Sequence, residues 1–512
     1  MADKKQRVVY WGSSPLDIGE YLSAHVDFDT VDKDVTPEEI LTGAYRDAVF
    51  LLGLGAAVWN QPEVFVKLPA NLILYDRRCD LSAEIQRMAD LKNAHSLDFT
   101  DLDRLAHVVH YDFFPGRWSY KLPFDSLRVA TSFTGDVLEE GQVGITFRGS
   151  FGQEWTSIAT WQQMTWSYGD WYETLYPECQ FSENVDVQFL VRVVNIKSGE
   201  LLAVHKLDAA HFEEGLTFYV GKEDAYIMVS VAAKGEGDVT LGWQHVNRTR
   251  ETYGHLFAGG QMIREPHALA QGVATYFEAG DLKPPLIVYF SGFHSAETFE
   301  GNYMVRSFKS PYLLITDNRL EGGAIYFGSD GLETQIAMTI RNTLKRLGFG
   351  PHDLILAGLS MGTTGALYYG AQLLPRAIVV GKPLPDWGTV ALNGRLLRPT
   401  GFPTALDMLL IQQGDTDLSA VTGLNEHFWK EFNKADFSQT ILGIGYMRQD
   451  DYQSDAFPKI YRQLSEQNGR VQLLHKGWIG RHNDDTNSVV KWFVRIIKLT
   501  LKNEFNRPEA MN

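Results

Sequence analysis

The feature that most constrains this chain is an apolar segment that runs directly into a glycine-flanked serine. Residues 353–357 read Asp-Leu-Ile-Leu-Ala, and Gly358-Leu-Ser360-Met-Gly362 follows without a break. Thr-Thr-Gly-Ala-Leu-Tyr-Tyr comes next, and its small and then apolar residues predict a helix. A buried strand, a Gly-x-Ser-x-Gly turn and a helix in this order are typical of the nucleophile elbow of an α/β-hydrolase fold. The plainer alternative is a glycine-rich strand-to-helix turn in a Rossmann-type sheet.

In an elbow of this kind the serine sits in a strained turn, and the helix passes close to the strand. Side chains at Gly358 and Gly362 would clash there, which explains the two glycines. Ser360 is therefore the predicted nucleophile. The N–H of Met361, at the start of the helix, is the first predicted oxyanion donor.

The second oxyanion donor is expected from an earlier loop. Residues 284–290, Pro-Pro-Leu-Ile-Val-Tyr-Phe, predict a buried strand, and Ser-Gly-Phe-His follows. In this fold the corresponding loop supplies an oxyanion N–H, so Gly292 and Phe293 are the candidates. We interpret His294 as a structural loop residue, because the base of this fold comes last in chain order.

Three histidines that follow the serine are candidates for the catalytic base. His427 lies in an aromatic, helix-like stretch, which favours a packing role. His475 comes at the end of a predicted strand over 471–474. His482 lies in the loop Gly-Trp-Ile-Gly-Arg-His-Asn-Asp-Asp-Thr, before a predicted helix over 488–501. A base on such a loop can reach the nucleophile, so His482 is favoured over His475.

The acid is less well defined, because two predicted strands are each followed by a pair of carboxylates. The acid should follow the strand before the histidine strand, since these two strands lie side by side in the sheet. That rule selects Asp450 or Asp451, after a predicted strand over 440–447, and leaves the choice between them open. Capping of the next helix is their alternative role. The fallback acids are Asp415 and Asp417, after a predicted strand over 409–412.

Length and local texture divide the chain into three parts. At about 100–200 residues per domain, 512 residues suggest roughly three domains, and the fold class is α/β. Residues 1–120 alternate strands with helix-like segments and predict a Rossmann-like α/β domain. Residues 121–275 are rich in Val, Ile and aromatics between turns, which predicts a β-sandwich and then a linker over 253–281; a carbohydrate-binding-like role of this sandwich is an open alternative. Residues 276–512 hold the predicted α/β-hydrolase domain.

The middle part contains closely spaced aromatic side chains. Rings with this spacing either stack on sugars or fill the core of a sandwich, and packing is the favoured interpretation. The residues concerned are Trp155, Trp161, Trp166, Tyr168, Trp171, Tyr172 and Tyr176.

Charge and composition argue against several partner and cofactor classes. The 47 Lys and Arg against 63 Asp and Glu give a net charge of −16, so nucleic acid is not expected as a partner. The sequence has no His-x-x-x-His pair, cysteine cluster or P-loop, and we expect no metal and no cofactor. Two cysteines, short apolar runs and no apolar signal-peptide core predict a cytoplasmic protein.

Three motifs together resemble one protein family. They are Gly-Leu-Ser-Met-Gly-Thr-Thr-Gly-Ala-Leu-Tyr-Tyr-Gly from residue 358, Gly-Tyr-Met-Arg-Gln-Asp-Asp-Tyr from residue 445 and Gly-Arg-His-Asn-Asp-Asp-Thr from residue 480. With the length and domain order, they resemble the second small accessory proteins of the accessory Sec system of Gram-positive bacteria, over nearly the whole chain. The resemblance implies a catalytic triad of Ser360, His482 and one of Asp450 and Asp451.

The resemblance also implies a biological setting. Such proteins support export of serine-rich-repeat glycoprotein adhesins with two companion accessory Sec proteins and a motor ATPase, and they O-acetylate GlcNAc on the adhesin. The expected location is cytoplasmic, with peripheral association at the membrane translocon. A Ser-His-acid site delivers an acyl group to water or to a sugar through the same acyl-enzyme. A small-ester carboxylesterase therefore stays open as an alternative function. A non-catalytic adhesin-binding chaperone or scaffold of the export complex is a second alternative. No motif indicates the acyl donor.

Overall fold

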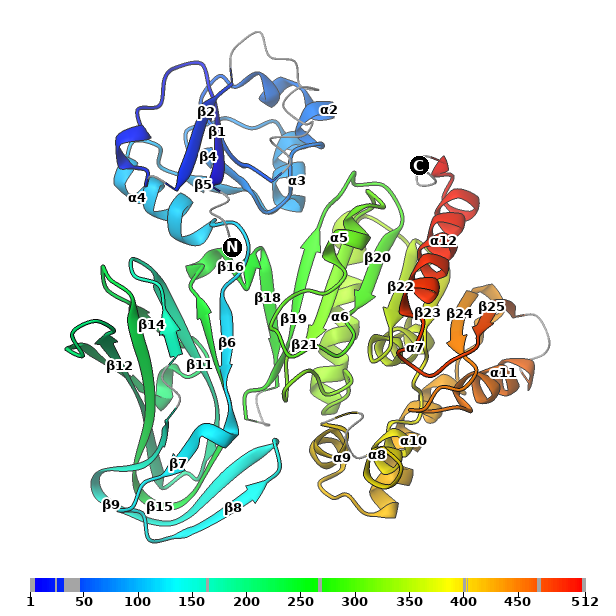
Figure 1. Cartoon of the computed structure of the whole chain (residues 1–512). Coiled ribbons are helices and arrows are strands. Elements are labelled where there is room, and N and C mark those ends of the chain that lie inside the picture. The colour runs from blue at the N-terminus through cyan, green and yellow to red at the C-terminus, as the bar shows by residue number, and fades with distance from the viewer. Residues whose placement is uncertain are drawn as a thin grey trace.

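The chain folds into three large sheets that follow one another along the sequence (Figure 1). A two-stranded ribbon, β16 (Gly254–His255) and β17 (Phe257–Ala258), connects the second sheet to the third. The fold is therefore mixed α/β, as predicted. The computed structural model describes residues 5–23, 25–31, 47–162, 165–265, 269–398, 402, 404–466 and 471–508.

The N-terminal sheet has five parallel strands in the order β2-β1-β3-β4-β5. Alternate side chains of its central strands pack into two separate apolar clusters. Val9 and Phe50 belong to one cluster, and Val8 and Val49 belong to the other. Both faces are therefore covered, as a parallel sheet requires. The elements are β1 (Gln6–Trp11), β2 (Val26–Thr30), β3 (Val49–Leu52), β4 (Ile73–Asp76), β5 (His95–Leu97), α2 (Pro62–Phe65), α3 (Ala83–Leu91) and α4 (Leu102–His107).

The middle strands form one connected antiparallel sheet of ten strands. Its centre is β15 (Ala225–Arg248), whose 24 residues pair with five other strands. The register between β15 and β9 shifts at Val231/Ala232 and on both sides of Gly235, and such bulges bend a strand. The other strands are β6 (Ser119–Leu122), β7 (Leu127–Val129), β8 (Asp136–Glu140), β9 (Gly144–Trp161), β10 (Thr165–Ser167), β11 (Tyr172–Phe181), β12 (Val185–Asn195), β13 (Leu201–Asp208) and β14 (Leu216–Tyr219).

The C-terminal sheet has eight strands in the order β18-β19-β21-β20-β22-β23-β24-β25. The pairs β18–β19 and β19–β21 are antiparallel, and all the other pairs are parallel. The carboxyl ends of the parallel strands therefore meet at one edge, where open α/β sheets bind their ligands. The strands are β18 (Gly260–Arg264), β19 (Gly272–Glu278), β20 (Leu286–Phe290), β21 (Tyr312–Asp317), β22 (Leu354–Leu359), β23 (Ala377–Gly381), β24 (Ile441–Met447) and β25 (Gln472–Trp478).

Helices cover both faces of this sheet (Figure 1). On one face, Phe493 of α12 packs in a cluster with Ile355 and Val379. On the other, Ile340 of α6 packs in a cluster with Leu356. The helices are α5 (Asn302–Arg306), α6 (Asp330–Leu347), α7 (Gly362–Leu373), α8 (Trp387–Leu396), α9 (Ala405–Gln413), α10 (Leu418–Phe432), α11 (Ala456–Glu466) and α12 (Thr486–Glu504).

Two expectations about local structure need correction. Strands β18 and β19 lie where a linker over 253–281 was expected, so the C-terminal sheet begins well before residue 276. Residues 409–412, expected as a strand, belong to helix α9, because this apolar run packs on neighbouring helices and joins no sheet. None of the described helices has both the length and the apolar character that crossing a bilayer requires.

Candidate active site

Ser360 occupies a tight turn between β22 and α7. Its φ angle is +52°, a left-handed conformation that costs a residue with a side chain about 1–3 kcal/mol. The turn is held from both sides. The N–H of Ser360 donates to Gly381 O at 2.8 Å, and its carbonyl accepts from the Thr363 hydroxyl at 2.6 Å. The hydroxyl of Ser360 therefore projects at the carboxyl edge of the sheet from a fixed backbone.

The glycines on either side of the serine are required by packing. A Cβ atom at Gly358 would lie 2.2 Å from Gly362 O, and one at Gly362 would lie 2.0 Å from Phe290 O. Neither distance is compatible with a side chain. The close passage of the helix past the strand, predicted from the motif, is thus present in the structure.

Ser360, His482 and Asp450 form a continuous hydrogen-bonded chain. Ser360 Oγ lies 2.9 Å from His482 Nε2, and His482 Nδ1 lies 2.7 Å from Asp450 Oδ2. In the neutral ring with its proton on Nδ1, Nδ1–H donates to the carboxylate and Nε2 accepts a hydrogen bond from the serine hydroxyl. The three residues follow β22, β25 and β24, and the carboxyl ends of these strands meet at one edge because all three run parallel in the same sheet.

The two neighbouring carboxylates, which the sequence left open, have different partners. Asp450 Oδ2 contacts the imidazole, while its Oδ1 accepts from the N–H of Tyr452 at 3.0 Å. Asp451 Oδ1 accepts from the backbone N–H of His482 at 3.0 Å, and its Oδ2 lies 3.2 Å from Arg398 Nε. Asp450 therefore orients the ring, and Asp451 fixes the loop that carries it.

Electrostatics keep the imidazole neutral. Burial lowers the pKa of His482 below its ordinary value, Asp450 opposes this shift, and the cation of Lys382 adds to it. His482 is only 1% exposed. Burial also lowers the pKa of Lys382, whose Nζ donates to Thr486 Oγ1 at 3.1 Å. A neutral imidazole is the form that can take a proton from the serine.

The expected oxyanion donors divide into two groups. Among the described residues, the N–H groups of Met361 and Phe293 donate to no protein acceptor. The N–H of Gly292, in contrast, donates to Glu300 Oε2 at 2.5 Å. Within the described part of the chain, Met361 and Phe293 therefore keep free N–H groups and remain the candidate oxyanion donors, whereas the N–H of Gly292 is occupied.

Comparison with known proteins places the chain in a family. The family model described as "Accessory Sec system GspB-transporter" matches residues 27–507. The chain belongs to this family. The resemblance to accessory Sec proteins that the three sequence motifs indicated is thereby confirmed.

Individual proteins of known sequence or structure are also similar to this GspB-transporter family member. The accessory Sec system protein of Staphylococcus aureus is 41% identical over 395 residues, which cover 77% of this chain and 75% of the relative. The Streptococcus gordonii protein is 35% identical over 418 residues, covering 81% and 80%. A chain of the Glycosylation Associate Protein (Gap123) complex from Streptococcus agalactiae aligns with a TM-score of 0.88 and 29% identity, covering 98% of this chain and 99% of that chain.

The other histidine candidates of this family member lie in different surroundings. His294 is held within its loop, with Nδ1 2.6 Å from Ala296 O. His427 Nε2 lies 2.9 Å from a Glu333 oxygen. The ring of His475 packs 4.9 Å from Phe457. These contacts agree with the loop and helix-packing roles expected for His294 and His427.

The fallback acids also have another role. Asp415 follows helix α9 and not a strand, and Asp417 caps α10 by accepting from the N–H of Ala420 at 2.8 Å. Both therefore belong to a helix-to-helix turn. Among the described residues, no group of three or more His, Cys, Asp and Glu side chains is arranged to hold a metal ion.

Sequence reasoning missed several residues of the site. Lys382 follows the end of β23, and its place at the carboxyl edge is a signal that could have found it. The Tyr452 ring packs 4.5 Å from the His482 ring, and Tyr452 directly follows the predicted acids. Glu300 and Arg398 reach the site from a loop and from the end of α8, and no sequence pattern marks them.

Proposed function

We propose that this accessory Sec family member is an acyltransferase that O-acetylates GlcNAc on serine-rich-repeat glycoprotein adhesins and supports their export. The observation that carries the chemistry is the chain from Ser360 through His482 to Asp450, at 2.9 and 2.7 Å. A hydroxyl, an imidazole and a buried carboxylate in this order activate a serine for acyl transfer. Family membership supports the export setting, and the sugar substrate comes from the resemblance.

The first half of the reaction forms an acyl-enzyme. Ser360 Oγ attacks the carbonyl carbon of the donor's acetyl group while His482 Nε2 takes the hydroxyl proton. The negative charge that develops on the carbonyl oxygen is stabilised by the N–H groups of Met361 and Phe293. When the intermediate collapses, the bond to the leaving group breaks and His482 returns its proton to that group.

The second half passes the acetyl group to the acceptor. A sugar hydroxyl gives its proton to His482 and attacks the acetyl carbon of the ester on Ser360. The tetrahedral intermediate then releases Ser360 Oγ, which regains the proton from His482. Water in place of the sugar would give hydrolysis. Asp450 stabilises the imidazolium in both halves.

The order of the strands also supports a proposed fold for each of the three units. We propose an α/β-hydrolase fold for the C-terminal unit, which starts at β18 and not at residue 276, after an N-terminal Rossmann-like unit and a middle β-sandwich. In support, Ser360 follows the fifth strand of its sheet in chain order, and the loop with Phe293 follows the third. The proposed acid and base follow the seventh and eighth strands.

A sugar-binding role for the middle sheet is supported by a few aromatics on its surface. Trp161 is buried in the core, but Trp155, Trp166 and Tyr168 are 40%, 39% and 42% exposed. The rings of Trp166 and Tyr168 lie 4.2 Å apart. Exposed rings of this kind offer apolar faces to sugars, so the middle sheet is the proposed place where a glycosylated adhesin docks.

The proposed partners are two companion accessory Sec proteins, the motor ATPase and the adhesin itself. In support, the Streptococcus agalactiae relative is described as part of a complex. We propose that the protein acts in the cytoplasm, at the inner face of the translocon.

The test is mass spectrometry of adhesin glycans made with the wild type and with Ser360→Ala. The variant should give glycans without acetyl groups, while its thermal unfolding matches the wild type. Asp415→Asn is a matched control, since it changes an exposed carboxylate in a helix-to-helix turn and should leave acetylation intact. Acetylation that persists in Ser360→Ala would refute the mechanism.

Export of the adhesin, measured in cells that make the wild type or Ser360→Ala, distinguishes the enzyme from the scaffold. If Ser360→Ala abolishes acetylation and keeps export, a scaffold role exists beside the enzyme. If acetate is released without transfer to a GlcNAc-bearing acceptor, the protein is a carboxylesterase.

A further inference from the structure

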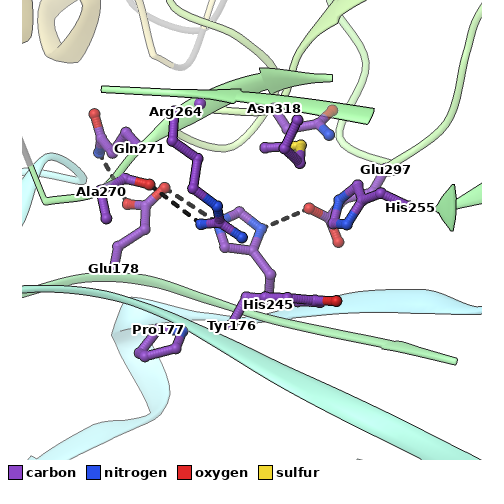
Figure 2. A pocket seen from close by; sticks show the side chains of 12 residues that line it. Tyr176, Pro177, Glu178, His245, His255, Arg264, Ala270, Gln271, Glu297 and Asn318 are labelled. Carbon is purple, nitrogen blue, oxygen red and sulfur yellow. Dashed lines mark hydrogen bonds and ion pairs between the residues drawn. The ribbon is translucent and has the colours of Figure 1, made fainter. Parts of the chain in front are cut away.

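The loop over residues 291–301 connects the candidate active site to the middle sheet. It follows β20 and carries Phe293, one of the two available oxyanion donors. Four residues later, Glu297 is 3% exposed and is buried against the middle sheet (Figure 2). The same short loop therefore takes part in two regions of the molecule.

Glu297 is held by Arg117, which lies just before β6, and by Ser119 and His245 of the middle sheet. Its backbone carbonyl accepts from Arg117 Nη1 at 3.0 Å and from Ser119 Oγ at 3.1 Å. Its carboxylate Oε1 accepts from Nδ1 of His245, on β15, at 2.5 Å. Backbone and side chain are both fixed, so the loop cannot shift here without breaking contacts to the middle sheet.

His245 is itself anchored on its other side. Its Nε2 donates to Glu178 Oε1 at 3.0 Å, and Glu178 Oε2 accepts from Gln271 Nε2 at 2.8 Å (Figure 2). Burial opposes the charged form of His245, but Glu297 and Glu178 outweigh it and raise the pKa of His245 to about 9. A cation between two buried carboxylates is a strong and directional link.

A second contact supports the neighbouring loop. Lys121 of β6 donates its Nζ to the carbonyl oxygens of Asn318 and Leu320, both at 2.7 Å. Gly322, two residues further on, lies directly against the Phe293 ring and accepts from the N–H of His294 at 3.4 Å. The middle unit thus holds both the oxyanion loop and the segment on which that loop rests.

We propose that the middle sheet positions the oxyanion loop through Glu297, so that Glu297 and His245 are positioning residues for acyl transfer. The proposal rests on the function proposed above. Glu297 acts through the backbone of Phe293 and does not contact the reacting atoms. Misplacement of catalytic groups by about 1 Å from a distant change costs about 100-fold in rate.

The experiment measures hydrolysis of p-nitrophenyl acetate by full-length Glu297→Ala, His245→Ala and Glu297→Gln. The two alanine variants should lower kcat about 100-fold with KM within about twofold, because the donor acts in the transition state. The double alanine variant should be no worse than either single one, since both break one link. Glu297→Gln keeps an acceptor for His245 and should recover most of the rate.

The matched control is Asp407→Ala. Asp407, on α9, accepts from the N–H of Gln142 at 2.8 Å, so it also joins the middle unit to the C-terminal one without touching the loop. This variant should keep the wild-type kcat. Amide hydrogen exchange gives a readout that needs no catalysis: peptides from 291–301 should exchange faster in His245→Ala and not in Asp407→Ala.

The outcomes separate this proposal from the proposed function. If Ser360→Ala is inactive while the Glu297 and His245 variants behave like Asp407→Ala in both assays, the positioning role is refuted and the enzyme stands. If Ser360→Ala keeps the wild-type rate, the enzyme is refuted, and with it a positioning role in catalysis. If the alanine variants do not fold, Glu297→Gln decides: a wild-type exchange rate with a kcat at least about 100-fold lower would refute positioning through this link.

Discussion

Asp450→Asn tests the candidate triad most sharply, because the structure dictates how the new amide must lie. Asp450 Oδ1 accepts from the N–H of Tyr452 at 3.0 Å and from that of Gln453 at 3.4 Å, so the amide oxygen has to take this position. The amide NH₂ then faces Nδ1 of His482. The ring must accept there, which puts its proton on Nε2, facing the serine. In that tautomer His482 cannot take the proton of Ser360.

The expected loss of activity in Asp450→Asn is large, because His482 is held in the wrong tautomer and the negative charge that stabilises its imidazolium is removed. Asparagine in place of a triad aspartate lowers kcat by about 10⁴-fold, which corresponds to about 5 kcal/mol of transition-state stabilisation. The residues are isosteric and the backbone contacts survive, so thermal unfolding should stay close to wild type. The assay is steady-state hydrolysis of p-nitrophenyl acetate, with Ser360→Ala as the baseline.

Asp451→Asn is the matched control for this prediction. Asp451 contacts the backbone of His482 and the side chain of Arg398, and an amide oxygen can still accept from the backbone N–H. Its kcat should stay within about tenfold of wild type. If Asp451→Asn lost more activity than Asp450→Asn, the assignment of the acid from the hydrogen-bond chain would be refuted.

Three further predictions concern packing, pH and stability. Gly358→Ala and Gly362→Ala should lower the free energy of unfolding, measured in urea, by about 1–3 kcal/mol or more. The control is Gly394→Ala, whose Cβ would lie 3.6 Å from Ala405 Cβ and which should not lower it. Equal values for the three variants would refute the packing argument. The activity kcat/KM should fall as the pH drops through the lowered pKa of His482, and Lys382→Met should move this fall to higher pH; an unmoved profile would show that the cation does not act on the ring. The pKa of His245 is raised from 6.5 to about 9 in the folded protein. The charged ring therefore stabilises the fold fully below pH 6.5, and this contribution is lost as the pH rises through about 9. Between those limits the wild-type unfolding free energy should fall by about 3 kcal/mol more than that of His245→Gln.

The two side chains that meet at the candidate site, Ser360 and His482, could be singled out from sequence because local chemistry constrains them. Only glycines fit where α7 passes β22, so the motif around Ser360 fixes its turn. Chain order and a glycine-containing loop were enough to favour His482. The choice between Asp450 and Asp451 was not decidable in this way. Both carboxylates follow the same strand, and the one that reaches the imidazole is set by the contacts that the two make in the turn after β24.

The errors have a common physical origin in tertiary packing. Residues 409–412 are apolar and short, and periodicity does not distinguish such a run from a strand. They form part of α9 because α8 and α10 offer an apolar surface to pack against. Glycine breakers in residues 253–281 suggested a linker, but β18 and β19 add to the edge of the C-terminal sheet. Pairing with β21, a distant partner, determines their structure.

The contacts of Glu297 bear on which part of the chain is the catalytic unit. Ser360, Asp450 and His482 all follow strands of the C-terminal sheet, so that sheet alone can assemble the candidate triad. The loop with Phe293 is different, because its outer half is fixed by Ser119 and His245 of the middle sheet and by Arg117, which precedes β6. A change in the middle sheet, such as docking of an adhesin glycan at its exposed aromatics, would reach the oxyanion donor through one short segment. On the proposed function, the smallest catalytic unit therefore contains the middle sheet as well as the C-terminal one.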